Sequence, residues 1–382
     1  MPYPTRRRFG VHTLSLALAG VSPGLWAQPN AASPRRIVLG QSVPLTGAAA
    51  EVGLAFTAGA KLGVDAFNAR KPSPGFSFEL RQLDDGYDPA RAEANARKLL
   101  AEGADLLFGF VGTGSSDAAA RVAKAEGTLL FAPFAASDEL RDAKHPEVFH
   151  VRPSLSDEAF KIVRHAVTLG QTRIAVVGEA DAMGRAGQAA VAQALDELKQ
   201  PAAVAVQTVP VNSPQVDAAV AALMKAQPQA VVLVSLFNAS AAVIRKMRAA
   251  GFRGTFMCFS VVGLDPLFTA LGPDIGGVVV SQVVPSPRSS ATPIVKEYLA
   301  ALDNSDQSPS YESLEGFIAA KTLAEGVRRV GKGFDRARLQ ATLAGMTDYD
   351  VGGFRINLRA GLRDAVRSID LVTIRPDGRV VR

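Results

Sequence analysis

The sequence has very little cysteine and histidine, the residues on which most metal sites and many nucleophilic sites depend. Cys258 is the only cysteine in 382 residues, so no disulfide can form within the chain. It lies in an apolar segment that is typical of a buried, inert thiol. The four histidines are His12, His145, His150 and His165, and none has a partner at metal-ligand spacing. The sequence therefore predicts no metal ion, no cofactor and no enzyme of a nucleophile-and-base type.

Patterns that bind nucleotides or nucleic acids are missing as well. Gly109, Gly112 and Gly114 are spaced G-x-x-G-x-G, which matches neither the dinucleotide fingerprint nor a Walker loop with its lysine. Removal of residues 1–27 takes away three arginines and no acid, so the formal net charge falls from +6 to +3. Because the rest of the chain has no dense Lys/Arg run, no nucleic-acid partner is expected.

No apolar run is long enough to suggest a membrane span. Residues 1–27 instead have the pattern of an export signal, with arginines at 6–8, an apolar stretch at 11–19 and cleavage expected near Ala27. This apolar stretch is far shorter than the roughly 20 residues that a spanning helix needs. The general secretory route and the twin-arginine route are both compatible with the pattern.

Two buried strands, each followed by a loop of small residues, stand out in the remaining chain. Apolar runs at 106–110 and 129–134 flank a helix, a pattern typical of a parallel sheet covered on both faces. The carboxyl ends of such strands meet at one sheet edge, which brings the loops 111–116 and 135–137 together. A helix beginning near Ser116 adds a positive dipole end. The pattern predicts a site for a small anion or zwitterion, although tight turns also need Gly and Ser without any ligand.

Strand and helix alternate through two long stretches, about 37–151 and 156–284. A chain of this length usually forms two domains, and the restart after the first stretch indicates two α/β lobes, each with a doubly wound parallel sheet. Near the C-terminus, 353–358 and 369–375 have the alternation of a closing pair of antiparallel strands.

A resemblance to a known family extends over nearly the whole chain after the signal. Its landmarks, in family order, include IVLGQSVPLTG, LDDGYDPARAEANARKLL, FGFVGTGSS, LFAPFAASDELRD and RIAVVGEADAMGRAG. These segments resemble the periplasmic substrate-binding proteins of branched-chain amino acid type ABC transporters, which have the type I periplasmic binding fold. The resemblance implies two lobes joined by a three-strand hinge, with lobe one formed by 28–152 plus 284–345 and lobe two by 153–283 plus 346–382.

The function implied by this resemblance is that of a periplasmic solute receptor. Such a receptor captures a small carboxylate or amino acid between its lobes, closes on it and delivers it to a membrane ABC permease. A monomer is expected. The alternatives are an exported α/β enzyme acting on a small carboxylate or amide, and a ligand-sensing receptor of the same fold. Asp84 and Asp85 would be the acid pair of such an enzyme, but adjacent acids in a turn more commonly cap the chain and face water.

The resemblance also implies the ligand site. Thr113 corresponds to the Ser or Thr that holds the ligand carboxylate, and the loop 134–136 supplies backbone groups. In lobe two, Met183 replaces an aromatic residue, Ser260 replaces the acid that takes an α-ammonium, and Ser156 replaces an aspartate. A further aromatic position of the family falls at Leu236 or Phe237. The residues expected to line the site are Thr113, Gly114, Ser115, Phe134, Ala135, Ala136, Ser156, Met183, Phe237 and Ser260. Simple core packing is the alternative interpretation of Met183 and Phe237.

Two departures from the family pattern, one in each lobe, bear on the kind of ligand. Ser260 stands in place of the acid and Val52 in place of a tyrosine, so the obvious partners of an ammonium group are missing. A buried ammonium without a partner is costly. The hypothesis is a small aliphatic or aromatic carboxylate without an α-amino group, with Asp157 or Glu51 as alternative sources of negative charge.

Overall fold

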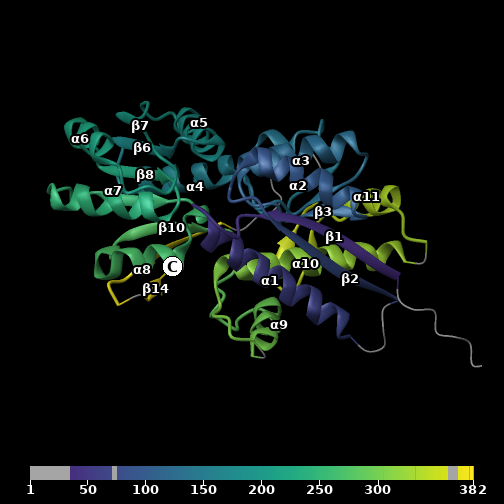
Figure 1. Ribbon diagram of the computed structural model, residues 1–382. Helices are drawn as coiled ribbons and strands as arrows, with labels where there is room; N and C mark the ends of the chain where they lie inside the picture. The colour runs from purple at the N-terminus through teal and green to yellow at the C-terminus, as the bar shows by residue number, and fades with distance from the viewer. Residues whose placement is uncertain are drawn as a thin grey trace, which may run out of the picture. The chain divides into compact units, whose positions relative to one another are not determined.

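The computed structural model of the protein describes residues 35–70, 75–303, 305–331, 333–359, 369–377 and 379–381 (Figure 1). The expected export signal and its cleavage site near Ala27 lie outside these residues. The described strands are β1 (Arg35–Val43), β2 (Phe76–Asp84), β3 (Leu106–Phe108), β4 (Leu130–Phe131), β5 (Val148–Phe149), β6 (Ile174–Glu179), β7 (Ala205–Val209), β8 (Ala230–Val234), β9 (Thr255–Cys258), β10 (Val278–Gln282), β11 (Tyr349–Asp350), β12 (Arg355–Ile356), β13 (Asp370–Ile374) and β14 (Val380–Val381).

Helices connect these strands and cover the sheets. They are α1 (Ala50–Asn68), α2 (Pro89–Ala101), α3 (Thr113–Ala125), α4 (Leu155–Thr168), α5 (Ala182–Glu197), α6 (Asp217–Ala226), α7 (Phe237–Ala249), α8 (Leu264–Leu271), α9 (Pro293–Leu302), α10 (Tyr311–Val330) and α11 (Arg336–Ala344). Short 3-10 turns occur at Glu139–Arg141, Ser260–Val262 and Gly272–Ile275. Among the described residues, no helix has the length and apolar character needed to span a membrane.

The first sheet is parallel throughout and has the order β2-β1-β3-β4-β5. Beyond the ends of β3 and β4, Val111 and Phe134 form one more parallel bridge, and the Gly112 amide donates to the Phe134 carbonyl at 3.1 Å. The two small-residue loops therefore lie side by side, as predicted. The strand expected at 129–134 is shorter, because Ala132 has a left-handed backbone (φ 53°) that interrupts the ladder.

The second sheet has the order β14-β13-β10-β9-β8-β6-β7, and β6 to β10 are parallel to one another. Cys258 is fully buried in β9, as expected, and burial raises the pKa of its thiol to about 12. The predicted pairing of the closing segments is wrong. β13 pairs antiparallel with β10 and β14, whereas β12 pairs with β11. The alternation in β13 buries Val372 and Ile374 against the second sheet, which explains its position there.

Helix α10 follows β10 of the second sheet in sequence but packs on α1 of the first sheet (Figure 1). The two backbones approach closely at glycines: a Cβ on Gly59 would lie 1.7 Å from the Ser313 carbonyl oxygen, and one on Gly316 would lie 2.1 Å from the Phe56 carbonyl oxygen. We use the term first lobe for the β1–β5 sheet with α1, α2, α3 and α10, and the term second lobe for the seven-stranded sheet with α4 to α8. The sequence boundaries given above for the lobes stay predictions.

Candidate functional site

A small cavity lies at the carboxyl ends of β3 and β4 and is closed by residues of the second lobe. Its lining is almost entirely apolar and contains no acidic or basic side chain: Ala49, Val52, Tyr87, Val111, Gly112, Thr113, Phe134, Ala135, Ala136, Leu155, Met183, Leu236 and Val261. The room inside is about 20 Å³, close to what one water molecule needs. A ligand of amino-acid size therefore requires the walls to move apart. A wider surface hollow of about 580 Å³ near Pro285 and Arg355 contains neither loop and is a weaker candidate.

The helix that opens at this cavity begins earlier than predicted. α3 starts at Thr113 rather than near Ser116, and no side chain caps its first turn. Gly112 precedes it with φ 99°, a conformation that other residues rarely adopt. The amides of a first helical turn have no partner within the helix and carry the positive end of its dipole. The buried Thr113 side chain and these amides can together hold a carboxylate.

The structure brings only part of the predicted site together. Thr113, Phe134, Ala135, Ala136 and Met183 line the cavity, and Leu236 lines it in place of its neighbour Phe237. The other predicted residues, Gly114, Ser115, Ser156, Phe237 and Ser260, lie outside the lining.

Local contacts explain where several of these residues point. A Cβ on Gly114 would meet Pro89 at 2.7 Å, so this glycine borders α2. The Ser156 hydroxyl donates to Asp138 at 2.8 Å. Phe237 is the first residue of α7 and packs against the core from the outside. The sequence pattern does not distinguish such neighbours, because adjacent loop residues face different sides.

Ser260 belongs to a buried group that we call the arginine cluster, made of Arg152, Glu158, Ser260, Ser281 and Glu315. The Arg152 Nη2 donates to the Ser260 hydroxyl at 2.6 Å and lies 3.6 Å from Glu158. Ser260 in turn donates to Glu158 through its hydroxyl (3.0 Å) and its amide (2.9 Å). The position that the resemblance assigns to an ammonium-binding acid is thus engaged with protein groups.

The arginine cluster lies directly behind one wall of the cavity. The Arg152 guanidinium stacks on the ring of Phe134, 4.3 Å from the ring centroid. Its other side lies 3.6 Å from Glu315 of α10. Arg152 and Glu158 are fully buried and Glu315 nearly so. The cluster therefore joins the cavity wall to elements of both lobes.

The two alternative sources of negative charge do not line the cavity either. The Asp157 carboxylate accepts from the Ser154 amide at 2.9 Å and from its hydroxyl at 2.8 Å, which completes a capping box at the start of α4. Glu51 is exposed in the first turn of α1. Because Asp157 is engaged in the capping box and Glu51 points to solvent, neither carboxylate belongs to the cavity lining.

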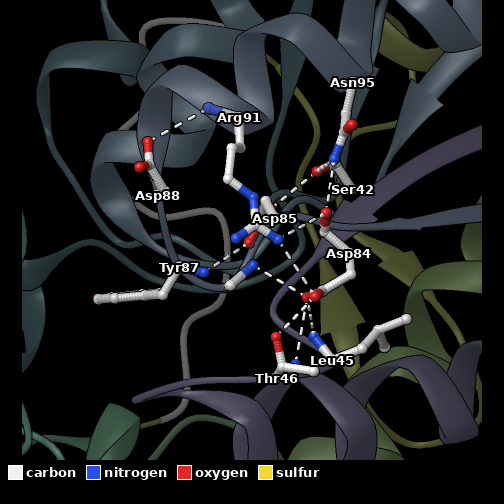
Figure 2. Close-up of polar contacts among 10 residues, drawn as sticks. Ser42, Leu45, Thr46, Asp84, Asp85, Tyr87, Asp88, Arg91 and Asn95 are labelled. Atoms are coloured by element: carbon white, nitrogen blue, oxygen red, sulfur yellow. Dashed lines mark hydrogen bonds and ion pairs between the residues drawn. The ribbon is translucent and has the colours of Figure 1, made fainter.

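The expected acid pair Asp84 and Asp85 shapes a turn, as Figure 2 shows. Asp84 accepts from the amides of Leu45 and Gly86 and from the Thr46 side chain. Burial opposes ionisation of Asp84, but these hydrogen bonds outweigh it and lower its pKa to about 2. The expectation that both acids face water is wrong for Asp85, which is fully buried.

Asp85 holds the backbone of a residue that the sequence did not single out. Its Oδ2 accepts from the Ser42 hydroxyl at 2.8 Å, and its Oδ1 accepts from the Tyr87 amide at 2.9 Å. Burial raises the pKa of Asp85 to about 6. Tyr87 lines the cavity, and Figure 2 shows its ring pointing away from both carboxylates. A lone tyrosine after Gly86 has no periodic pattern, so no sequence signal indicated its role.

Glu179, at the end of β6, is a second residue that the sequence analysis missed. One carboxylate oxygen accepts from the amides of Asn212 (2.8 Å) and Leu236 (3.0 Å). The side chain is 1% exposed, and burial raises its pKa to about 7. Glu179 therefore positions the backbone of the cavity residue Leu236 without reaching the lining itself.

We expect the protein to be less stable at pH 7.5 than at pH 5.5. Burial raises the folded pKa of several carboxyl groups above the ordinary value, so the native state binds more protons than the unfolded state up to about pH 7. The groups are Asp85 and Asp117 (about 6) and Glu179 and Glu315 (about 7). The unfolding free energy should fall on the order of 2 kcal/mol over this window, because one pKa unit corresponds to about 1.4 kcal/mol.

Thermal unfolding between pH 4.5 and 8 measures this effect. Burial lowers the pKa of His150, and this shift alone makes the protein more stable as the pH rises. Below about pH 6.5 it therefore reduces the fall of the unfolding free energy with pH without reversing it. Glu179→Gln removes one titrating group and should flatten the profile between pH 5.5 and 7.5. A midpoint that rises steadily across this window would contradict the prediction.

Two open α/β sheets whose strand ends meet one cavity define a two-lobed binding protein of the type I periplasmic binding class. The chain belongs to the periplasmic binding protein family, whose model matches residues 36–379. This family consists of periplasmic binding proteins, in agreement with the interpretation that the chain is not an enzyme.

Relatives and solved structures agree with this assignment. The chain is 25% identical over 274 residues to the leucine-specific-binding protein of Salmonella typhimurium, covering 71% of this chain and 73% of the relative. The crystal structure of a possible leucine/isoleucine/valine-binding protein from Rhodopirellula baltica is 28% identical with a TM-score of 0.86, covering 93% of this chain and 98% of that one. A substrate-binding periplasmic protein from Ralstonia solanacearum is 30% identical with a TM-score of 0.84, covering 90% and 99%.

Proposed function

We propose that this protein is the periplasmic solute receptor of an ABC transporter and delivers a small carboxylate to a membrane permease. In this proposal the chain is exported, its signal peptide is cleaved near Ala27, and the mature protein is a monomer. The observation that carries the proposal is the cavity at the start of α3, where Thr113 and the first-turn amides face apolar walls. The amide end suits a carboxylate and the walls suit a hydrocarbon body.

The ligand class follows from the charges around the cavity. No acidic side chain belongs to the lining, and Ser260 is engaged with Arg152 and Glu158. An α-ammonium group in this cavity would lose water without gaining a charged partner, which costs several kcal/mol. We infer an aliphatic or aromatic carboxylate without an α-amino group. The names of the relatives make leucine, isoleucine and valine the competing ligands.

Thermal unfolding of the mature protein against matched pairs of ligands tests the proposal. The pairs are leucine with 4-methylpentanoate, valine with 3-methylbutanoate and phenylalanine with 3-phenylpropanoate, which differ only in the amino group. A ligand at about 100 times its dissociation constant stabilises the native state by roughly 2.7 kcal/mol. We expect the larger shift from the deaminated member of a pair. A larger shift with the amino acid would overturn the ligand class, and no shift with any member would overturn the carboxylate proposal.

Thr113→Val should weaken binding of the best acid in this panel by about tenfold or more, because a hydrogen bond to a charged group contributes about 1.5–3 kcal/mol. Valine keeps the shape of threonine and removes only the hydroxyl. Isothermal titration calorimetry on both proteins measures the change. Thr322→Val is the matched control, since Thr322 is also fully buried but donates to the Ile318 carbonyl within α10. Equal affinity of Thr113→Val and the parent would exclude Thr113 from the site.

A further inference from the structure

Two hydrogen bonds made by side chains join the lobes at the cavity, in addition to the backbone bond from the Leu155 amide to the Ala136 carbonyl (2.7 Å). The Tyr87 hydroxyl of the first lobe donates to the Asp181 Oδ2 of the second lobe at 3.1 Å. The Asn212 side-chain amide of the second lobe donates to the Ala48 carbonyl of the first lobe at 2.5 Å. Tyr87 itself and Ala49, the neighbour of Ala48, belong to the cavity lining. Both bonds therefore lie at the border of the cavity.

Several contacts fix Tyr87 in its orientation. Its backbone has φ 68°, which is rare for a bulky residue and persists only where the surroundings enforce it. The Asp85 carboxylate holds its amide. Its ring lies against Gly112, where an added Cβ would be 2.5 Å from the ring edge. The phenol is thus held across the gap between the lobes and does not rotate like a surface side chain.

Asp181 is equally well placed on the opposite side. It is the N-cap of α5, and its Oδ1 accepts from the Gly184 amide at 2.8 Å. The other carboxylate oxygen accepts from Tyr87. Because α5 also carries the cavity residue Met183, the same carboxylate fixes one wall of the cavity and bonds to the opposite lobe.

The second bond has a similar support. Asn212 has φ 44°, and its amide donates to Glu179. Its side-chain oxygen accepts from the Asn238 amide at 2.8 Å, which turns the Nδ2 group toward Ala48. Glu179 also holds Leu236 of the cavity lining. The contacts that orient this bond are therefore the ones that shape the wall of the second lobe.

We propose that the Tyr87 to Asp181 and Asn212 to Ala48 hydrogen bonds form a latch that holds the cleft closed without a charged ligand group. The inference rests on the proposed function, since it assumes that the ligand is enclosed in this cavity. An ion pair between a ligand ammonium group and the protein would otherwise hold the second lobe in the closed position, but the cavity lining provides no acid for such a pair. In this latch Tyr87 is both a wall of the cavity and the contact that couples ligand fit to closure.

Amide hydrogen exchange of the full mature chain, measured with no ligand added, tests the latch. Tyr87→Phe keeps the ring and removes the hydroxyl, and we expect exchange in 85–89 and 182–185 to rise about tenfold, the effect of one lost hydrogen bond to a charged group. Asp181→Ser keeps an N-cap but is too short to reach Tyr87, so it should raise exchange to the same extent. The double variant should exchange no faster than either single variant if the two residues act through one bond.

Tyr349→Phe is the matched control, because Tyr349 lies on β11 outside the cavity lining, and it should leave both segments unchanged. Parent-like exchange in Tyr87→Phe, or additive increases in the double variant, would overturn the latch. This readout is independent of ligand identity. If the acid panel fails while Tyr87→Phe opens the cleft, the ligand proposal falls and the latch stands. If an acid binds, Tyr87→Phe should weaken its affinity about tenfold. If an acid binds and Tyr87→Phe changes neither exchange nor affinity, only the latch falls.

Discussion

Arg152→Met is expected to destabilise the protein by about 3–5 kcal/mol, the usual result of leaving buried charges without their partner. The Arg152 guanidinium is fully buried, lies 3.6 Å from both Glu158 and Glu315, and donates to Ser260. Its removal leaves two buried carboxyl groups facing each other. Burial already raises the pKa of Glu315 to about 7. Methionine would fill part of the volume but would offer no charge and no donor.

Urea unfolding of the purified protein at pH 7.5 measures the loss. The control is Arg97→Met, because Arg97 is half exposed and pairs with Glu93 at 3.0 Å on the surface of α2; exposed pairs contribute about 0–1 kcal/mol. The double variant Arg152→Met with Glu315→Gln removes one stranded carboxylate and should recover part of the stability. A loss below about 1 kcal/mol in Arg152→Met would show that the cluster does not hold its charges as described.

Gly59→Ala should destabilise the protein by about 3 kcal/mol, at the upper end of the range for overpacking. The added Cβ would lie 1.7 Å from the Ser313 carbonyl oxygen, so α1 and α10 would have to separate. The obstacle is backbone, which cannot turn aside as a side chain can. The loss should appear in the urea midpoint and in weaker packing of the first lobe.

The control for this variant adds the same methyl group where it makes only ordinary van der Waals contacts. Gly345 follows α11 with an ordinary helical backbone, and the nearest atoms to its Cβ would be 3.5 Å away. Gly345→Ala should change the stability by less than about 0.5 kcal/mol, as expected for a site away from close contacts. Equal effects of the two substitutions would mean that the α1 to α10 contact is not tight.

The fold was largely predictable because its sheets are parallel and buried. Continuous apolar runs such as 106–110, separated by helices, indicate such sheets without knowledge of any partner strand. The closing strands were not predictable in the same way. β13 pairs with β10, which lies far away in sequence, and alternation alone contains no information about such a partner. The early end of β4 before Ala132 was not predictable for a similar reason, since nothing in this residue type indicates a left-handed backbone.

The candidate site was likewise predictable only in part. The loops after β3 and β4 were predictable, because strand ends gather at one edge of a parallel sheet. The position of Ser260 outside the cavity lining was not predictable, because a sequence does not show that its hydroxyl is engaged with Arg152 and Glu158. Tyr87 was missed, because its position depends on Asp85 and Gly112 together, which meet only in the folded chain.

The contact between α1 and α10 has a consequence for how the chain acquires its structure. Gly59 and Gly63 of α1 lie against Ser313 and Ala320 of α10, about two thirds of the chain further on. During synthesis, the face of α1 that these residues cover stays open to solvent until nearly the whole polypeptide has emerged. The first lobe therefore completes its core late, when α4 to α8 and the parallel strands of the second lobe have already been made, and a chain truncated before residue 311 would leave that face of α1 bare.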